Sequence, residues 1–369
     1  MDPKPPINYW DYIRVEELLS LQGGLEQDSS GVSNDEVLFI TVHQIYELWF
    51  HLVLRELGSL RDFFHQEVVA EQALSNAVRS IRRVSTLFRQ CAAHFEVMET
   101  LTTRAYLGFR DKLMPASGFQ SGQMRQMEIL LGLPAAERIP LGSSESWLDA
   151  LRAHDGSESS ALRRVREQLE NGPSLLAAVE EWLFRTPIDG VGPTEAGAEA
   201  TLARFVDAYL AAQASEVDTT CRHALERTRS EPDRERLRER YAAEKAALHA
   251  FLHPTEAEGG ARRRRIRAAV LLIHSYREFP LLAWPREVLD GLIELEQLML
   301  VFRQRHARMV ERVIGRRTGT GGSSGVDYLD RTALSYRVFR DLWAVRTFEI
   351  RRDANPPLEN AGFYGFLHA

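Results

Sequence analysis

Two histidines far apart in the chain are the residues whose type and setting could do chemistry. His43 lies in the apolar run 38–50, and His306 follows Phe302 and Arg303 shortly before a glycine-rich stretch, 319–325. Largely apolar neighbours at helical spacing predict that each imidazole points into the protein interior. A buried imidazole needs partners for both nitrogens. Each is therefore either a core histidine bonded to a carbonyl or carboxylate, or a histidine that holds a metal or ligand.

The pattern of histidines and cysteines argues against a zinc site. No His-Glu-x-x-His pair occurs, and the two cysteines, Cys91 and Cys221, are not in a Cys-x-x-Cys pair. Two isolated cysteines are typical of a reducing compartment.

The glycine-rich stretch 319–325 is not a P-loop, because it lacks the lysine and no predicted strand leads into it. One interpretation is a flexible connector that follows a helix stop at Gly315. The other is a mobile lid whose backbone N–H groups and Thr320 hydroxyl close over a small polar ligand.

Arg110 follows Tyr106 and Phe109, and an arginine held between aromatic rings can offer a rigid fork to a carboxylate. The alternative is a structural ion pair with an internal acid, Asp111 or Glu99.

These residues must be positioned by helices, since apolar residues recur at three- and four-residue spacing and alternating strand-like runs are scarce. The fold class is predicted to be all-α, as a single large helical domain over residues 1–369. Residues 186–262 are expected to form a charged helical excursion. The predicted helices span residues 15–21, 35–65, 72–101, 122–131, 161–170, 174–184, 198–226, 233–252, 262–279 and 285–314.

Composition restricts the class of protein further. A hydrophobic content of 44% and a charged content of 27% over 369 residues are typical of a soluble globular protein with a sizeable core. The net charge of -6 gives no field that would attract nucleic acid, and the basic run 262–265 is expected to be a solvated helix start. No signal peptide is visible and no stretch approaches the length needed to span a bilayer, so we expect a cytoplasmic protein that binds neither membrane nor nucleic acid.

Taken together, the motifs resemble those of the tryptophan 2,3-dioxygenase family, which is all-helical and haem-dependent. The resemblance lies in residues 9–22, 35–57, 99–126, 181–187, 276–280 and 303–329. It implies a haem b cofactor and a homotetramer, in which an N-terminal segment, residues 1–25, reaches a neighbouring subunit.

The resemblance also implies roles for individual residues. His306 matches the proximal ligand of the haem iron, and His43 matches the distal histidine that faces the indole N–H. Arg110 matches the residue that clamps the substrate carboxylate. The remaining matches are substrate-binding positions: Phe39, Tyr106, Thr320, Tyr9, Tyr12 and Ile13.

The implied reaction inserts O2 across the indole C2–C3 bond of L-tryptophan and gives N-formylkynurenine. Two alternatives stay open: mono-oxygenation of a substituted tryptophan to an oxindole-type product, and a non-catalytic haem or small-molecule sensor. The first is favoured by positions that depart from the family pattern, namely Asn34, Ile45, Phe95, Gly122, Phe279 and Phe302.

Overall fold

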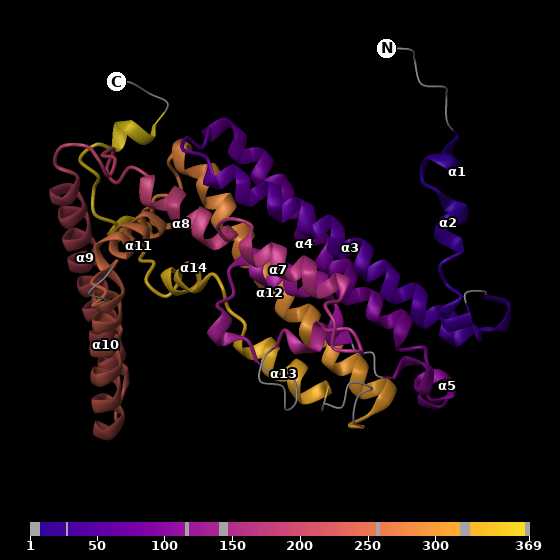
Figure 1. The fold of residues 1–369 in the computed structure, drawn as a ribbon. Coiled ribbons are helices and arrows are strands. Elements are labelled where there is room, and N and C mark those ends of the chain that lie inside the picture. Colours follow the sequence, from indigo (N-terminus) through magenta and orange to yellow (C-terminus); the bar gives the residue numbers. More distant parts are fainter. Residues whose placement is uncertain are drawn as a thin grey trace, which may run out of the picture. The chain divides into compact units, whose positions relative to one another are not determined.

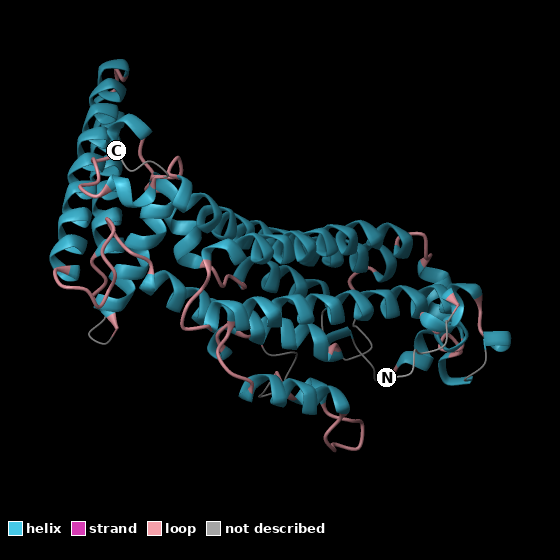
Figure 2. Ribbon diagram, turned by 90° about the horizontal axis from the view of Figure 1, so that it is seen from above, coloured by secondary structure: helices cyan, strands magenta, loops and turns pink. Residues whose placement is uncertain are grey.

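The computed structural model describes residues 8–26, 29–114, 118–139, 147–255, 259–317 and 325–365. Within these ranges the chain is helical and contains no named strand, only an isolated bridge between Ile188 and Val191 (Figure 2). The all-α prediction is therefore confirmed. Thr320 lies outside the described residues.

The helices, shown in Figure 1, agree with the predicted ones to within two residues at 35–65, 122–131, 161–170, 174–184, 198–226 and 233–252. Their bounds are α1 (Tyr9–Tyr12), α2 (Val15–Leu19), α3 (Asn34–His65), α4 (Leu74–Met98), α5 (Thr103–Phe109), α6 (Gly122–Leu131), α7 (Ser160–Glu170), α8 (Leu175–Arg185), α9 (Ala198–Arg227), α10 (Glu231–Leu252), α11 (Gly260–Ser275), α12 (Pro280–Ile314), α13 (Gly325–Ser335) and α14 (Arg340–Val345).

The boundary between α11 and α12 differs from the prediction, which extended the first helix to residue 279 and began the second at Pro285. The helical region is disfavoured for a residue before proline, which favours a helix end before Pro280. Pro280 lacks an N–H and suits the first turn, and α12 begins there. Pro285 lies inside the helix.

The described chain divides into two compact units. Unit 1 comprises residues 1–56, 84–172 and 297–336, and unit 2 comprises residues 57–83, 173–296 and 337–369. Both candidate histidines belong to unit 1.

The core of unit 1 is an aromatic cluster at which three helices meet. The Phe302 ring on α12 lies 6.0 Å from Tyr46 on α3, and 5.9 Å and 5.2 Å from Phe88 and Phe95 on α4, between ring centroids. Edge-to-face and tilted contacts at these distances add to the stabilisation from burial alone. The cluster fixes α12, and hence His306, against α3 and α4.

Packing between α6 and α7 explains why residue 122, one of the departures from the family pattern, is a glycine. A Cβ atom at this position would lie 3.1 Å from the Cβ and 3.2 Å from the Cα of Ala161. The absent side chain therefore lets α6 approach α7 closely, so glycine here serves packing within unit 1.

Unit 2 corrects the prediction that the basic run 262–265 is only a solvated helix start. Arg265 is buried, its Nε donates to the Phe184 carbonyl at 2.9 Å, and its Nη2 donates to the Val191 carbonyl at 3.0 Å. Arg262 pairs with Glu181 at 2.6 Å. The run was misjudged because carbonyls that lie far away in the sequence receive its donors.

In the same unit, α9 and α10 pack against each other, with Lys245 2.6 Å from Asp218. The described part of α10 buries only Leu248, Phe251 and Leu252. The charged stretch therefore forms an antiparallel helical pair with mostly solvated faces.

A second expectation, that no stretch is long and apolar enough to span a bilayer, is wrong for helix α3. A window of 18 residues in α3 has a mean hydropathy of 1.4, which meets that condition by length and composition alone. The core helix of a soluble protein meets the same condition, and one face of α3 carries the buried residues Val42, Tyr46, Phe50 and Val53. Only 22% of the window is buried, so this stripe at helical spacing is the part of α3 that packs on the core of unit 1.

Candidate active site

Among the described residues, aromatic rings are what hold His306. Its ring is parallel to the Phe95 ring, with centroids 5.2 Å apart and planes inclined by 7°, and the Phe302 ring lies 6.1 Å away. No residue that the structure describes hydrogen-bonds to the imidazole. Burial, the His43 ring and Arg303 lower the pKa of His306 to about 4, so the ring is neutral at pH 7.

His43 lies one turn after Phe39 on α3, and its Nδ1 is 2.7 Å from the Phe39 carbonyl oxygen. Because a carbonyl oxygen only accepts, Nδ1 carries the proton and Nε2 keeps its lone pair in the neutral ring. The Phe39 ring lies 4.1 Å from the His43 ring, between centroids.

The prediction that His43 points into the interior is wrong in one respect, because solvent reaches its side chain. Desolvation by nearby protein atoms nevertheless lowers the pKa of His43, although the Phe39 carbonyl and Glu47 oppose the shift. The imidazole is therefore open to solvent, as expected of a group that meets a ligand.

The structure brings Phe39, Tyr106 and Arg110 together, as the sequence predicts. The Tyr106 ring is buried and lies 6.2 Å from Phe39, while Phe109 lies 5.5 Å from both rings, between centroids. Burial raises the pKa of Tyr106, and the charge of Arg110 and its hydrogen bond to the Tyr106 side chain oppose that rise. Arg110 is half-buried at the end of this aromatic wall.

Helix α5, which carries Tyr106, was missed in the sequence because it is only seven residues long. Thr102 caps it by accepting from the Ala105 N–H at 3.1 Å, and Thr103 donates to the Val313 carbonyl at 2.7 Å. The second bond ties α5 to α12, the helix that carries His306. Glu99, one of the acids considered for Arg110, pairs with Arg305 at 3.3 Å and with Arg312 at 3.5 Å.

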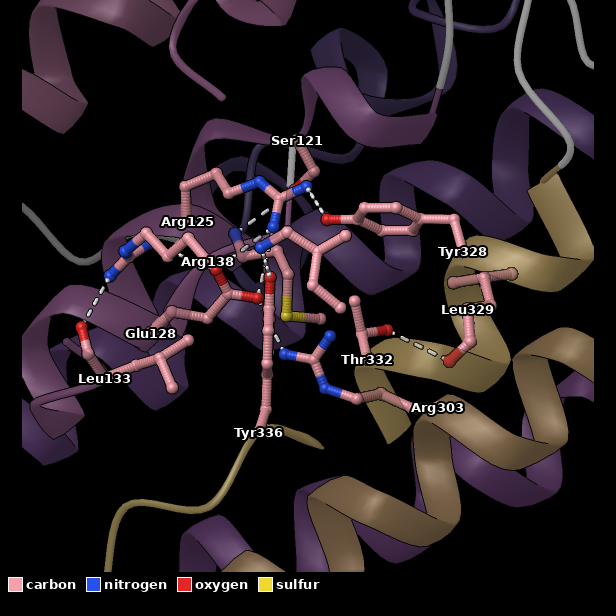
Figure 3. Close-up of polar contacts among 12 residues, drawn as sticks. Ser121, Arg125, Glu128, Leu133, Arg138, Arg303, Tyr328, Leu329, Thr332 and Tyr336 are labelled. Carbon is pink, nitrogen blue, oxygen red and sulfur yellow. Dashed lines mark hydrogen bonds and ion pairs between the residues drawn. The ribbon is translucent and has the colours of Figure 1, made fainter. Parts of the chain in front are cut away.

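A buried ionic cluster that we call the Glu128 cluster was also missed (Figure 3). Glu128 on α6 accepts from Arg303 at 2.7 Å, from Arg125 at 3.1 Å and from Arg138 at 3.2 Å. Burial alone would raise the pKa of Glu128, but the three arginines lower it, so the carboxylate is ionised. Since the partners lie up to 175 residues apart, no local pattern could reveal the cluster.

His94 is a further histidine that the sequence analysis did not select. Its Nε2 is buried without a hydrogen-bond partner in the described part of the chain, and its ring stands edge-on to Tyr46 at 5.7 Å, between centroids. It precedes Phe95 on α4, so it is the natural competitor of His306 as a ligand.

The predicted contacts of the N-terminal segment are exposed in this single chain. Tyr9 is 75% exposed, Tyr12 is 73% exposed and Ile13 is 44% exposed, so none of them lines the site within its own chain. The segment is anchored next to His43, since Gln44 donates to the Leu21 carbonyl at 2.8 Å and accepts from Gln22 at 2.8 Å.

The comparison with known proteins matches the sequence of this helical chain to one family of dioxygenases. A family model described as "Tryptophan 2,3-dioxygenase" matches residues 4–349. The chain is 56% identical to a tryptophan 2,3-dioxygenase of Sorangium cellulosum, over 98% of this chain and 87% of that protein. It is 50% identical to tryptophan 2,3-dioxygenase 2 of Ralstonia nicotianae, over 98% of both chains.

A third relative is a tryptophan 2,3-dioxygenase-like protein of Xanthomonas campestris, which is 48% identical over 72% of this chain and 98% of that protein. The chain therefore belongs to the tryptophan 2,3-dioxygenase family, and the resemblance predicted from its motifs is confirmed.

The residues present fit the haem that the family implies. A haem iron needs an accessible, neutral imidazole nitrogen, and His306 offers both nitrogens unbonded to any described residue. The rings of Phe95 and Phe302 supply apolar contacts to this half-buried side chain. His306 is therefore the candidate residue to hold the iron.

Proposed function

We propose that the chain is a haem b-dependent dioxygenase that inserts O2 across the indole C2–C3 bond of L-tryptophan and releases N-formylkynurenine. The observation that carries this proposal is the His306 imidazole, neutral and without a hydrogen bond to any described residue, in a chain of this family. When bound, ferrous haem supplies the O2-activating chemistry that no amino-acid side chain provides.

His43 is proposed to orient the indole. Because Nδ1–H donates a hydrogen bond to the Phe39 carbonyl, Nε2 is free of a proton and can accept a hydrogen bond from the indole N–H. The proton stays on Nδ1, so His43 acts as a fixed acceptor that selects one orientation of the ring. Phe39, 4.1 Å from His43 between ring centroids, would form a wall for the indole.

Arg110 is proposed to clamp the substrate carboxylate. A guanidinium at the end of an apolar wall pairs strongly with a carboxylate because few waters compete for either charge. Tyr106, which is hydrogen-bonded to Arg110, would hold the guanidinium in place. Thr320, outside the described residues, is proposed to meet the ammonium and carboxylate of the amino acid.

We also propose that the active protein is a homotetramer in the cytoplasm, in which Tyr9, Tyr12 and Ile13 reach a neighbouring subunit's site. Support comes from the exposure of these large side chains, since a monomer would leave them in water. Gln44 fixes the root of the segment beside His43, so the segment starts near the pocket wall.

The decisive experiment is product analysis with isotopically labelled O2. The reduced, haem-loaded protein is given L-tryptophan, and the expected product is N-formylkynurenine that carries both labelled atoms. Incorporation of one atom would instead favour mono-oxygenation, and haem binding without product from any indole amino acid would favour a sensor. Either result would overturn the proposal, as would a protein that takes up no haem.

A further inference from the structure

The Glu128 cluster is an unusual feature of unit 1 because its buried charges do not balance. Arg125, Arg138 and Arg303 are 8%, 7% and 8% exposed, and the carboxylate that they share, Glu128, is 2% exposed. Arginine stays protonated in proteins, so these four residues carry an excess of two positive charges.

Neutral groups, and not further acids, complete the contacts of the cluster that the structure describes (Figure 3). Arg125 donates to the Tyr328 hydroxyl at 3.0 Å, and Arg138 donates to the Leu133 carbonyl at 3.3 Å. Arg303 lies over the Tyr336 ring at 4.9 Å from its centroid. Ring faces and carbonyls hold the guanidinium groups without cancelling their charge.

Arg303 connects the cluster to the candidate iron ligand. It stands three residues before His306 on α12, and residues at this spacing are neighbours on one face of a helix. No described residue offers His306 a carboxylate that would draw its proton and make the ring anionic.

We infer that the Glu128 cluster is an electrostatic device that favours ferrous over ferric haem at His306. The inference rests on the proposed function, because it requires haem on that residue. The change is the uptake of one electron from an external reductant, with no bond formed or broken in the protein. Ferric iron carries one positive charge more than ferrous iron, so a buried excess of positive charge destabilises the ferric form more.

The test is a spectroelectrochemical titration of the holoenzyme with dithionite and redox mediators, without substrate. Arg303→Gln removes one positive charge and should lower the ferrous-to-ferric ratio at a fixed potential about tenfold, which is about 59 mV for one electron. Glu128→Gln removes the negative charge and should raise the ratio by a similar factor. Arg303→Lys, which keeps the charge, should stay near the parent value.

Arg308→Gln is the matched control. It makes the same charge change two residues after His306, but at a side chain 48% exposed that pairs with Asp330 and Glu311. Solvent screens that position, so its ratio should remain within about twofold of the parent.

Arg303→Gln and Glu128→Gln should shift the ferrous-to-ferric ratio in opposite directions. A structural role would not produce this result, because a loosened haem site would shift the ratio of both variants in the same direction. Shifts of the same sign, or equal shifts for Arg303→Gln and Arg308→Gln, would overturn the inference while leaving the proposed function intact. If Glu128→Gln fails to fold, Arg303→Gln against Arg303→Lys still decides. A parent protein that does not take up haem would instead remove the proposed function.

Discussion

The two candidate histidines, His43 and His306, both lie in unit 1 and both have a lowered pKa, but they are held in different ways. The Nδ1 proton of His43 is directed by a backbone carbonyl four residues earlier, at 2.7 Å, and solvent reaches the ring. His306 has no hydrogen bond to any described residue and is oriented by the parallel Phe95 ring. His43 is thus oriented by a carbonyl of its own helix, and His306 by a ring on a neighbouring helix, α4.

This difference matches what each residue is proposed to do. A hydrogen bond to one nitrogen sets the tautomer of His43, so the other nitrogen is a defined acceptor. The stacked Phe95 ring fixes the plane of the His306 ring without a hydrogen bond to either nitrogen. One nitrogen of the neutral imidazole therefore remains available to iron. We therefore expect variants at His306 to lose haem binding, and variants near His43 to lose turnover while they keep the haem.

The largest effect is expected at His306. His306→Ala should abolish stoichiometric haem binding, because it removes the imidazole that is proposed to hold the iron. The measurement is the Soret absorbance per protein after haem titration, with folding checked by circular dichroism.

His94→Ala is the matched control for this prediction, since His94 is also a histidine with an unpartnered nitrogen near Phe95. It should leave haem loading unchanged. If His94→Ala loses haem and His306→Ala keeps it, then His94 on α4 is the iron ligand and the assignment of His306 is wrong.

The next effect is expected at Arg110, on the side of His43. Arg110→Leu should reduce kcat/KM for L-tryptophan about 100-fold, from the loss of charge-assisted hydrogen bonds of about 3 kcal/mol in total. Haem loading should remain as in the parent. Steady-state kinetics and the Soret band measure the two quantities separately.

Arg110→Lys sharpens that prediction, because it keeps the charge and removes the two-pronged geometry. Its kcat/KM for L-tryptophan should lie between the values of the parent and of Arg110→Leu. Equal rates for parent and Arg110→Leu would show that the arginine serves only Tyr106.

How much of this could be predicted depends on how local the determining contacts are. Periodicity located α3 and α6 because their apolar stripes are written into consecutive turns. It could not locate α5, whose seven residues are stabilised by the Thr102 cap and by a bond to Val313. The latter partner lies 210 residues away.

The candidate site shows the same limit. His43 and His306 were selected from their apolar surroundings and from the family pattern, and in the structure Phe39, Tyr106 and Arg110 lie close together. The Glu128 cluster and the burial of Arg265 were missed, since an arginine in a sequence carries no sign of which distant oxygen will receive it. Long-range polar pairing, more than helix content, is what the sequence conceals.

A smaller effect than that of Arg110 is expected from removing the His43 acceptor. His43→Ala should reduce kcat/KM for L-tryptophan about tenfold, the value of one hydrogen bond of about 1.4 kcal/mol. With 1-methyl-L-tryptophan, which has no indole N–H, the same substitution should change kcat/KM by less than about twofold. Equal losses with the two substrates would mean that His43 acts through packing against Phe39.

The smallest effect concerns pH. Because the folded-state pKa of His43 is lowered, the ring stays neutral and Nε2 stays an acceptor as the pH falls through 6.5, the ordinary value. We expect kcat/KM for L-tryptophan to be flat from pH 8 to about 6.5 and to fall only in more acidic solution, where a protonated Nε2 can no longer accept the indole N–H. The linkage has the matching sign, since the unfolded chain takes up this proton first and the folded state therefore loses stability as the pH falls below 6.5.

The pH profile of His43→Gln provides the control, because its side chain does not titrate in this range. The acidic limb assigned to His43 should be absent from that variant, while the parent keeps it. A parent profile that already falls between pH 8 and 7 would contradict the lowered pKa. An acidic limb that persists in His43→Gln would belong to another group, and the acceptor role would then rest on the methylated substrate alone.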